Sequence, residues 1–159
     1  MVQIREGVPD DESRITEVHV ASVRGVDESA YTDDEFTVWE SGAASISYAL
    51  DDAATVFLVA EDDRSVAGFA EASVDKAELD KLYVAPSYQH QGIATSLSNE
   101  IDRRLRSHDV DSVYVEASVN AVPFYKRVGY EQVSTHQKSI THDGTSVEMT
   151  VVDMEKDLR

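Results

Sequence analysis

Small residues stand where a loop of this chain opens into its clearest helix. The segment covers residues 82–95, and Gly92 and Ala94 occupy the start of the helical pattern. Small side chains let a ligand approach the backbone closely, and the first N–H groups of a helix have no partner inside it. These groups carry the positive end of the helix dipole, so they can bind a phosphate without a cationic side chain. The sequence therefore predicts a phosphate site here, although the segment contains no Lys or Arg.

Two other phosphate-binding patterns do not fit this turn. A Walker A loop needs Gly-Lys-Ser/Thr at the helix start, but Gly92 is followed by Ile93. A dinucleotide-binding fingerprint needs a pair of glycines two residues apart, and Gly92 stands alone in this segment. Taken by itself, the turn indicates an anion site and does not say which phosphate ligand occupies it.

A second motif, farther along the chain, makes the pattern specific. It covers residues 120–130 and reads NAVPFYKRVGY, whereas the turn itself reads QHQGIA over residues 89–94. This pair resembles the signature of the GNAT superfamily of N-acetyltransferases, Gln/Arg-x-x-Gly-x-Gly/Ala at a helix start and a later Asn-Ala-x-x-Phe-Tyr-x-x-x-Gly-Phe/Tyr. The resemblance covers essentially the whole chain. It implies one domain over residues 1–159 that transfers an acetyl group from acetyl-CoA to a primary amine.

The resemblance also implies roles for individual residues. Backbone amides of residues 89–95 would hold the pyrophosphate of acetyl-CoA, and Asn120 would contact its pantetheine arm. The strand ending at Val84 would separate from strand 112–117 to admit that arm, and the Val84 N–H would polarise the thioester carbonyl. Gln91 departs from the family pattern, because a basic residue often stands there. The implied cofactor-binding residues are Leu82, Tyr83, Val84, Gln89, His90, Gln91, Gly92, Ile93, Ala94, Thr95 and Asn120.

Acetyl transfer also needs a base for the acceptor ammonium and an acid for the leaving thiolate. The resemblance implies that Tyr125 is the acid, and a thiol with a pKa of about 8.5 is a leaving group that a phenol can assist. A carboxylate acting directly or through water could be the base, and Glu116, Glu71 and Glu78 are the candidates. Glu116 is preferred because it precedes Tyr125 on the same edge of the sheet. A solvated carboxylate at a strand end would look the same in so acidic a chain.

Composition excludes several classes of protein. The chain has no Cys, which excludes a disulfide framework and thiolate metal sites and favours direct attack on the thioester over a cysteine acyl-enzyme. The five histidines show no metal-binding spacing, so no metal is predicted, and His90 is expected to be exposed. No stretch reaches the roughly 20 apolar residues of a membrane span, and no signal-peptide run opens the chain. We therefore expect a cytoplasmic protein that does not bind membranes.

The charge balance is strongly acidic. Lys and Arg number 14 against 31 Asp and Glu, which gives a net charge of −17. One interpretation is a halophilic surface suited to high salt, and the other is a field that attracts basic substrates. The first is favoured because carboxylates dominate the predicted loops, and salt at about 1 M shortens the Debye length to about 3 Å. Under either interpretation the chain is not expected to bind nucleic acid.

Hydrophobic periodicity predicts the elements that position these motifs. The clearest helix covers residues 92–107, where apolar residues recur every fourth position from Ile93 to Leu105. Strands are predicted at 2–5, 55–60, 65–73, 77–84, 112–117, 131–140 and 146–156, with other helices from residue 9, at 33–39 and at 120–128. This order predicts a single-domain α/β fold of the GNAT type, in which a central mixed sheet of about seven strands carries helices on both faces.

The acceptor and the assembly are left open. A peptide N-terminus, a lysine side chain and a small-molecule amine would all suit the predicted chemistry. Residues 10–39 and the hairpin around 141–146 are expected to wall the acceptor site, and Tyr31, Asp33, Asp34 and Trp39 there could suit a cationic or aromatic amine. The rival hypothesis is an acyl-CoA-binding domain of GNAT type without turnover, serving as a sensor or structural subunit. The C-terminal strands could pair between protomers, so a homodimer stays open.

Overall fold

The computed structural model describes residues 2–24, 48, 50, 52–142 and 144–159, without the side chain of His142. The predicted helix at 33–39 lies outside these residues, and the other predicted elements are all present. They are β1 (Val2–Glu6), α1 (Glu12–Arg24), β2 (Thr55–Asp62), β3 (Ser65–Ser73), β4 (Glu78–Val84), α3 (Ile93–Ser107), β5 (Ser112–Ser118), α4 (Val122–Arg127), β6 (Glu131–His142) and β7 (Thr145–Asp157). No helix in these described ranges is long and apolar enough to cross a membrane.

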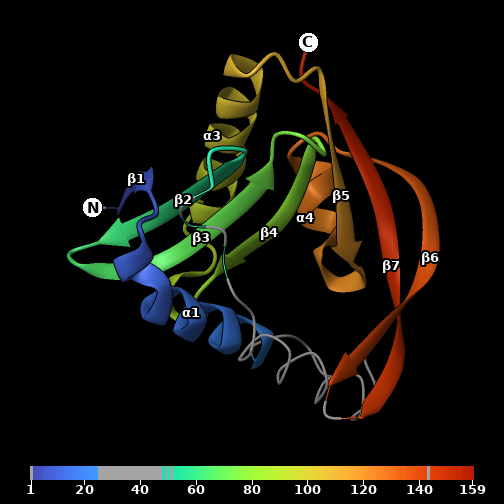
Figure 1. The fold of residues 1–159 in the computed structure, drawn as a ribbon, viewed down its shortest axis with the longest axis horizontal. Coiled ribbons are helices and arrows are strands. Elements are labelled where there is room, and N and C mark those ends of the chain that lie inside the picture. The colour runs from blue at the N-terminus through green and yellow to red at the C-terminus, as the bar shows by residue number, and fades with distance from the viewer. Residues whose placement is uncertain (1, 25–47, 49, 51, 143) are drawn as a thin grey trace.

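The strands of the described residues form one mixed sheet of seven in the order β1-β2-β3-β4-β5-β7-β6 (Figure 1). Every neighbouring pair is antiparallel except β4 and β5, which are parallel. α1 covers one face of the sheet, and α3 and α4 pack on the other. The predicted fold class is therefore confirmed, and β6 forms an edge of the sheet.

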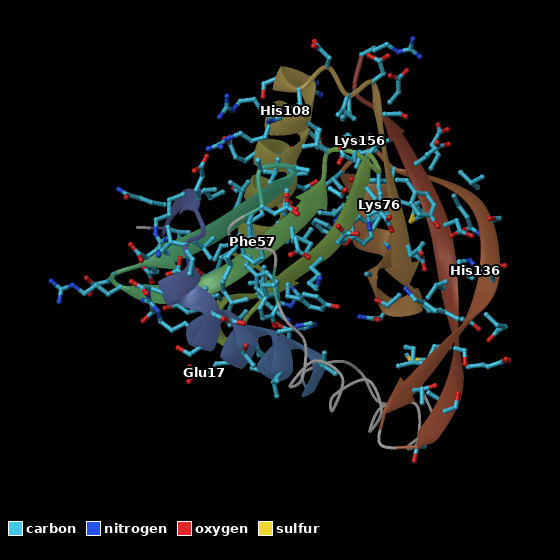
Figure 2. The ribbon with its side chains drawn as sticks, in the orientation of Figure 1. Glu17, Phe57, Lys76, His108, His136 and Lys156 are labelled. Carbon is cyan, nitrogen blue, oxygen red and sulfur yellow. The ribbon has the colours of Figure 1, made fainter. Side chains whose placement is uncertain are left out.

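Both faces of the central strands are buried. In β2 every residue from Val56 to Ala60 is buried, because alternate side chains meet different helices. Phe57, which is labelled in Figure 2, packs on the α1 side with Ile15, whereas Leu58 packs on the α3 side.

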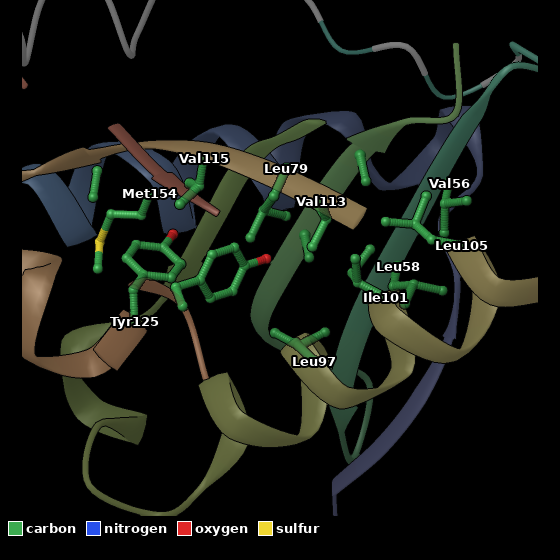
Figure 3. Close-up of a cluster of buried hydrophobic side chains, with 14 of the residues drawn as sticks. Val56, Leu58, Leu79, Leu97, Ile101, Leu105, Val113, Val115, Tyr125 and Met154 are labelled. Carbon is green, nitrogen blue, oxygen red and sulfur yellow. The ribbon is translucent and has the colours of Figure 1, made fainter. Parts of the chain in front are cut away.

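The apolar side chains along one face of α3 belong to the larger of two hydrophobic clusters in the described residues. Leu97, Ile101 and Leu105 are fully buried, and Ile93 at the start of the helix is 5% exposed. Figure 3 shows this face of α3 against side chains from several strands of the sheet, Val113 among them. The four-residue spacing seen in the sequence thus fixes α3 against the sheet and sets where its N-terminus lies.

A β-bulge in β4 changes which face its side chains occupy. Glu71 of β3 pairs with Lys81, whereas the next residue, Ala72, pairs with Leu79, so Asp80 is an extra residue in the ladder. Leu79 consequently packs beneath α3, while Tyr83 packs with the α1 cluster. In a regular strand these two odd-numbered positions would share one face.

Candidate active site

β4 and β5 separate soon after they meet. They pair only at Glu78 with Tyr114 and at Leu79 with Val115. Beyond these pairs, a pocket of about 570 Å³ lies between residues 80–84 of β4 and residues 115–118 of β5. We call this space the β4–β5 gap. Its volume lies within the range usual for sites that bind small molecules or cofactors.

Polar backbone groups of β4 face the gap. The N–H of Ala85 donates to the carbonyl of Ala67 on β3 at 2.8 Å. Successive residues of a strand direct their N–H groups to opposite sides, so the Val84 N–H is directed away from β3 and into the gap. The Val84 carbonyl lies 2.9 Å from Ser22 Oγ of α1, whose single hydroxyl hydrogen also has the Val18 carbonyl as an acceptor at 2.7 Å. The gap therefore has one backbone donor aimed into it, beside a carbonyl within reach of the Ser22 hydroxyl.

One end of the gap opens onto the start of α3. Gly92 caps the helix with a φ of +80°, and a Cβ at this position would meet no atom of the described residues within 4 Å. The backbone conformation therefore favours glycine, and no described residue fills the space above it. The first helical hydrogen bond runs from the Ser96 N–H to the Gly92 carbonyl at 3.0 Å. The N–H groups of Ile93, Ala94 and Thr95 thus stand outside the ladder of the helix, where they can bind an anion.

Tyr125 lies inside the wall of the pocket. Its side chain is 6% exposed, and its ring meets the ring of Tyr130 edge-on at 5.3 Å between centroids. Burial raises the pKa of the Tyr125 hydroxyl, and the nearby Tyr83 raises it further. Tyr125 is therefore protonated at neutral pH and can donate a proton. Asn120, in the turn before α4, lines the same pocket.

Glu116 reaches the pocket from the opposite face of the sheet. Its neighbours Val115 and Ala117 are buried beneath α3, so the alternation of β5 puts Glu116 on the α1 side. Its Oε2 lies 3.2 Å from Lys138 Nζ and 3.7 Å from His136 Nε2, both on β6.

The other two candidate bases do not line the pocket. Glu71 is 5% exposed and forms an ion pair with Lys81, so its carboxylate already has a cationic partner. Burial raises the pKa of Glu78, and the neighbouring Asp80 raises it further. Of the three carboxylates named from the sequence, Glu116 alone contacts the gap.

The structure brings the predicted site residues together with one exception. Gln91 is not among the residues that line the pocket, and every other predicted cofactor residue lines it, as do Tyr125 and Glu116. Within the described ranges no three His, Asp or Glu side chains converge as metal ligands.

Ser22, Lys138 and Arg127 are among the lining residues that sequence reasoning missed. Arg127 stands inside the second motif and could have been found there as a cation of the predicted site. Ser22 and Lys138 gave no signal, because they reach the pocket through the packing of α1 and through the position of β6 across the sheet.

In this site two parallel strands separate next to the start of a helix. Such an arrangement is typical of a known class of α/β transferase. The family model described as "Acetyltransferase (GNAT) domain" matches residues 27–158, so the chain belongs to the GNAT acetyltransferases. Enzymes of this family use acetyl-CoA as the acetyl donor, and the predicted co-substrate is confirmed at that level.

Solved structures support the same fold. A GCN5-related N-acetyltransferase from Rhodopseudomonas palustris superposes with a TM-score of 0.82 at 23% identity, over 98% of this chain and 94% of that one. The PaiA N-acetyltransferase of Thermoplasma acidophilum, in complex with coenzyme A, gives 0.78 at 21% identity over 99% of both chains. The ribosomal-protein-S18-alanine N-acetyltransferase of Escherichia coli gives 0.71 at 16% identity, over 99% of this chain and 94% of that one.

Proposed function

We propose that this chain transfers the acetyl group of acetyl-CoA to a primary amine by direct attack of the amine on the thioester. The observation that carries the proposal is the separation of β4 and β5 beyond Leu79 and Val115, which opens a gap onto the start of α3. The pantetheine arm lies in the gap as an added strand would, and Asn120 contacts it. The pyrophosphate lies against residues 89–95, where N–H groups outside the helix ladder are available.

The described residues supply each chemical requirement of the transfer. An amine with a pKa of about 10 is protonated at pH 7, and removing that proton costs about 4 kcal/mol. Glu116 takes this proton, directly or through water, and the neutral nitrogen attacks the thioester carbon. The Val84 N–H stabilises the oxyanion that forms. As the C–S bond breaks, the Tyr125 hydroxyl protonates the leaving thiolate.

Arg127 compensates for the lack of cations in the turn. Its side chain lines the pocket, with its guanidinium carbon 5.9 Å from the centre of the Phe124 ring. A phosphate of CoA at this end of the gap would otherwise meet only backbone dipoles, because Gln91 replaces the basic residue frequent in the family. Arginine binds phosphate through several parallel N–H groups, so one such residue adds both charge and orientation.

The acceptor enters from the α1 side of the sheet, the side that Glu116 occupies. Lys138, Ile140 and Met149 of the β6–β7 hairpin line the pocket there. Enzymes of this family acetylate small-molecule or protein amines, and both remain candidate acceptors for this chain. We propose a cytoplasmic enzyme, and a homodimer in which the β6 edge pairs with a second copy, as further parts of the same hypothesis.

Thermal melting with and without acetyl-CoA tests the site, at low salt and at about 2 M KCl. Ligand at 100 times its Kd should stabilise the folded protein by about 2.7 kcal/mol. Release of CoA thiol is then measured across an amine panel that includes an alkyl diamine, phenethylamine and a tripeptide with a free N-terminus. Stabilisation with turnover supports the enzyme, and stabilisation without turnover supports the rival acyl-CoA-binding domain. No stabilisation of a folded protein in either salt would refute the CoA site.

A further inference from the structure

An imidazole lies between two carboxylates on one face of the sheet. Glu116 of β5 and Asp153 of β7 are directly opposite in register and share one face. His136 of the neighbouring β6 lies over this pair, with Nδ1 at 2.9 Å from Asp153 Oδ2 and Nε2 at 3.7 Å from Glu116 Oε2. Figure 2 shows His136 on the outer strands, far from His108 at the end of α3. Three adjacent strands thus build one line of groups, carboxylate–imidazole–carboxylate.

The hydrogen bonds around Asp153 determine which ring nitrogen of His136 carries the hydrogen. Asp153 is 8% exposed and accepts hydrogen bonds from the Tyr114 hydroxyl and from Ser134 Oγ, the latter at 2.7 Å. The Tyr114 hydroxyl is the main cause that lowers the pKa of Asp153 to about 2, so this carboxylate stays ionised and can only accept hydrogen bonds. In the neutral ring, Nδ1 of His136 must therefore carry the hydrogen, and the lone pair of Nε2 faces Glu116.

We propose that His136, held by Asp153, relays the proton that Glu116 removes from the acceptor amine. The proposal rests on the N-acetyltransferase function proposed above. The ammonium proton moves to the Glu116 carboxylate, and the carboxyl group passes it to Nε2 of His136 through one water, because the 3.7 Å between them is longer than a direct hydrogen bond. The resulting imidazolium is stabilised by Asp153 and loses the proton to bulk water, since its side chain is 43% exposed. Glu116 is then ionised again for the next acceptor.

One proton leaves by this route in each turnover. The amine nitrogen forms a C–N bond as the C–S bond breaks, and Tyr125 gives its proton to the thiolate. The second proton on the nitrogen replaces the one that Tyr125 gave, so the products are the amide, CoA thiol and one released proton. No oxidant or additional co-reactant is needed.

A purely structural role for His136 would be to separate two carboxylates that repel each other. Each carboxylate already has other partners, because Lys138 Nζ lies 3.2 Å from Glu116 and two hydroxyls bond Asp153. The charged and titratable groups of the described chain that interact with this line are Tyr114 of β5, Lys138 of β6 and Glu78 of the neighbouring β4. The half-exposed His136 ring connects Glu116 to solvent. A ring that only separated two negative charges would not need this connection.

Two amine probes separate these roles in the variant His136→Gln. Phenethylamine is protonated at pH 7 and needs a base, whereas 2,2,2-trifluoroethylamine is already neutral at that pH. We expect kcat/KM for phenethylamine to fall about 10²-fold in His136→Gln, at the lower end of what general base catalysis contributes. The rate with trifluoroethylamine and the melting shift caused by acetyl-CoA should stay close to wild type.

One control variant accompanies this test. His108→Gln removes an exposed histidine from another part of the fold, and it should keep wild-type rates with both amines. A His136→Gln variant that slows both amines equally, or slows neither, would refute the relay.

The tautomer gives a readout that does not depend on activity. Nitrogen-15 NMR of the neutral His136 ring should show the hydrogen on Nδ1, and Asp153→Asn should shift it toward Nε2. A wild-type ring with its hydrogen on Nε2 would overturn the relay. A wild-type protein that acetylates no amine would instead refute the proposed function and remove the relay with it, whereas wild-type turnover that His136→Gln leaves intact refutes the relay alone.

Discussion

Leu79 of β4 lies opposite Val115 of β5, and it forms the last pair that these two strands share. Both side chains are almost fully buried beneath α3, at 2% and 3% exposure, so this point of the sheet is fixed by the core. The bulge at Asp80 follows at once, and bulges bend the strand that carries them. The β4–β5 gap therefore begins where the packing of β4 changes, one residue after its anchor.

Gly68 of β3 sets how closely β4 can approach from the other side. A Cβ at Gly68 would lie 2.8 Å from the Tyr83 carbonyl oxygen and 3.3 Å from the Val84 Cα, so the β4 backbone would have to move toward the gap. We expect Gly68→Ala to destabilise the protein by about 1–3 kcal/mol, as overpacking does. It should also reduce the melting shift caused by acetyl-CoA.

Ser65→Ala, at the exposed start of the same strand, is the control for Gly68→Ala and should change neither quantity. If Gly68→Ala melts like wild type and responds fully to acetyl-CoA, the approach of β3 to β4 does not define the gap.

Gly92→Glu should abolish the binding of acetyl-CoA. The substitution puts a carboxylate in the open space above the N-terminus of α3, where it would occupy the anion site and repel phosphate. Gly144→Glu is a matched control, because Gly144 also has a positive φ, at +76°, and no atom of the described part of the chain lies within 4 Å of a Cβ built there. Calorimetric titration of both variants with acetyl-CoA should show binding only in the control. Binding retained by Gly92→Glu would place the phosphates elsewhere.

Much of this fold could be predicted because apolar residues recur with a clear period along its helices and strands. Ile93 and Leu97 fixed the buried face of α3, and the Gly92 turn before them located the mouth of the pocket. The bulge at Asp80 could not be predicted, since it follows from the register between β3 and β4 and no residue type signals it. The contact of Glu116 with His136 was also hidden, because it depends on the order β5-β7-β6, in which the last strand inserts between the other two.

Tyr125→Phe should keep the affinity for acetyl-CoA and lower kcat. The lost hydroxyl is the proposed acid for the leaving thiolate, and general acid groups contribute roughly 10²–10⁴-fold to rate. Tyr130→Phe is the control, since the Tyr130 hydroxyl is also buried and has no hydrogen-bond partner among the described residues. CoA release measured for both variants should fall only for Tyr125→Phe. An unchanged kcat would remove Tyr125 from this role.

Salt should stabilise the folded chain. A net charge of −17 on 159 residues produces self-repulsion that salt screens, and the Debye length falls from about 10 Å at 0.1 M to about 3 Å at 1 M. The melting temperature should therefore rise between 0.1 and 2 M KCl. Sucrose at matched osmolality is the control, because it does not screen charge. A melting temperature that is flat or falls with KCl would contradict the salt-adapted interpretation of the surface.

His19 of α1 should make stability depend on pH in the weakly acidic range. Its ring is 3% exposed, lies 4.3 Å from the ring of Tyr83, and its Nδ1 is 2.9 Å from the Tyr48 hydroxyl. Burial, and then the positive charge of Lys81, lowers the pKa of His19 to about 4, whereas an unfolded histidine has a pKa of about 6.5. Between these two values the unfolded chain binds more protons, so the free energy of unfolding rises with pH.

The contribution of His19 to the free energy of unfolding is therefore complete above about pH 6.5. It is lost as the pH falls toward 4, at up to about 1.4 kcal/mol per pH unit. His19→Gln removes the titrating ring while keeping a polar group that can pair with Tyr48. Urea unfolding of both proteins at half-unit steps from pH 7.5 to 4 should show a shallower decline in the variant. Carboxylates such as Asp153 titrate in both proteins and cancel in the difference. If the two proteins decline in parallel, His19 has the same proton affinity in the folded and unfolded chain. Its ring would then be open to solvent on the α1 face.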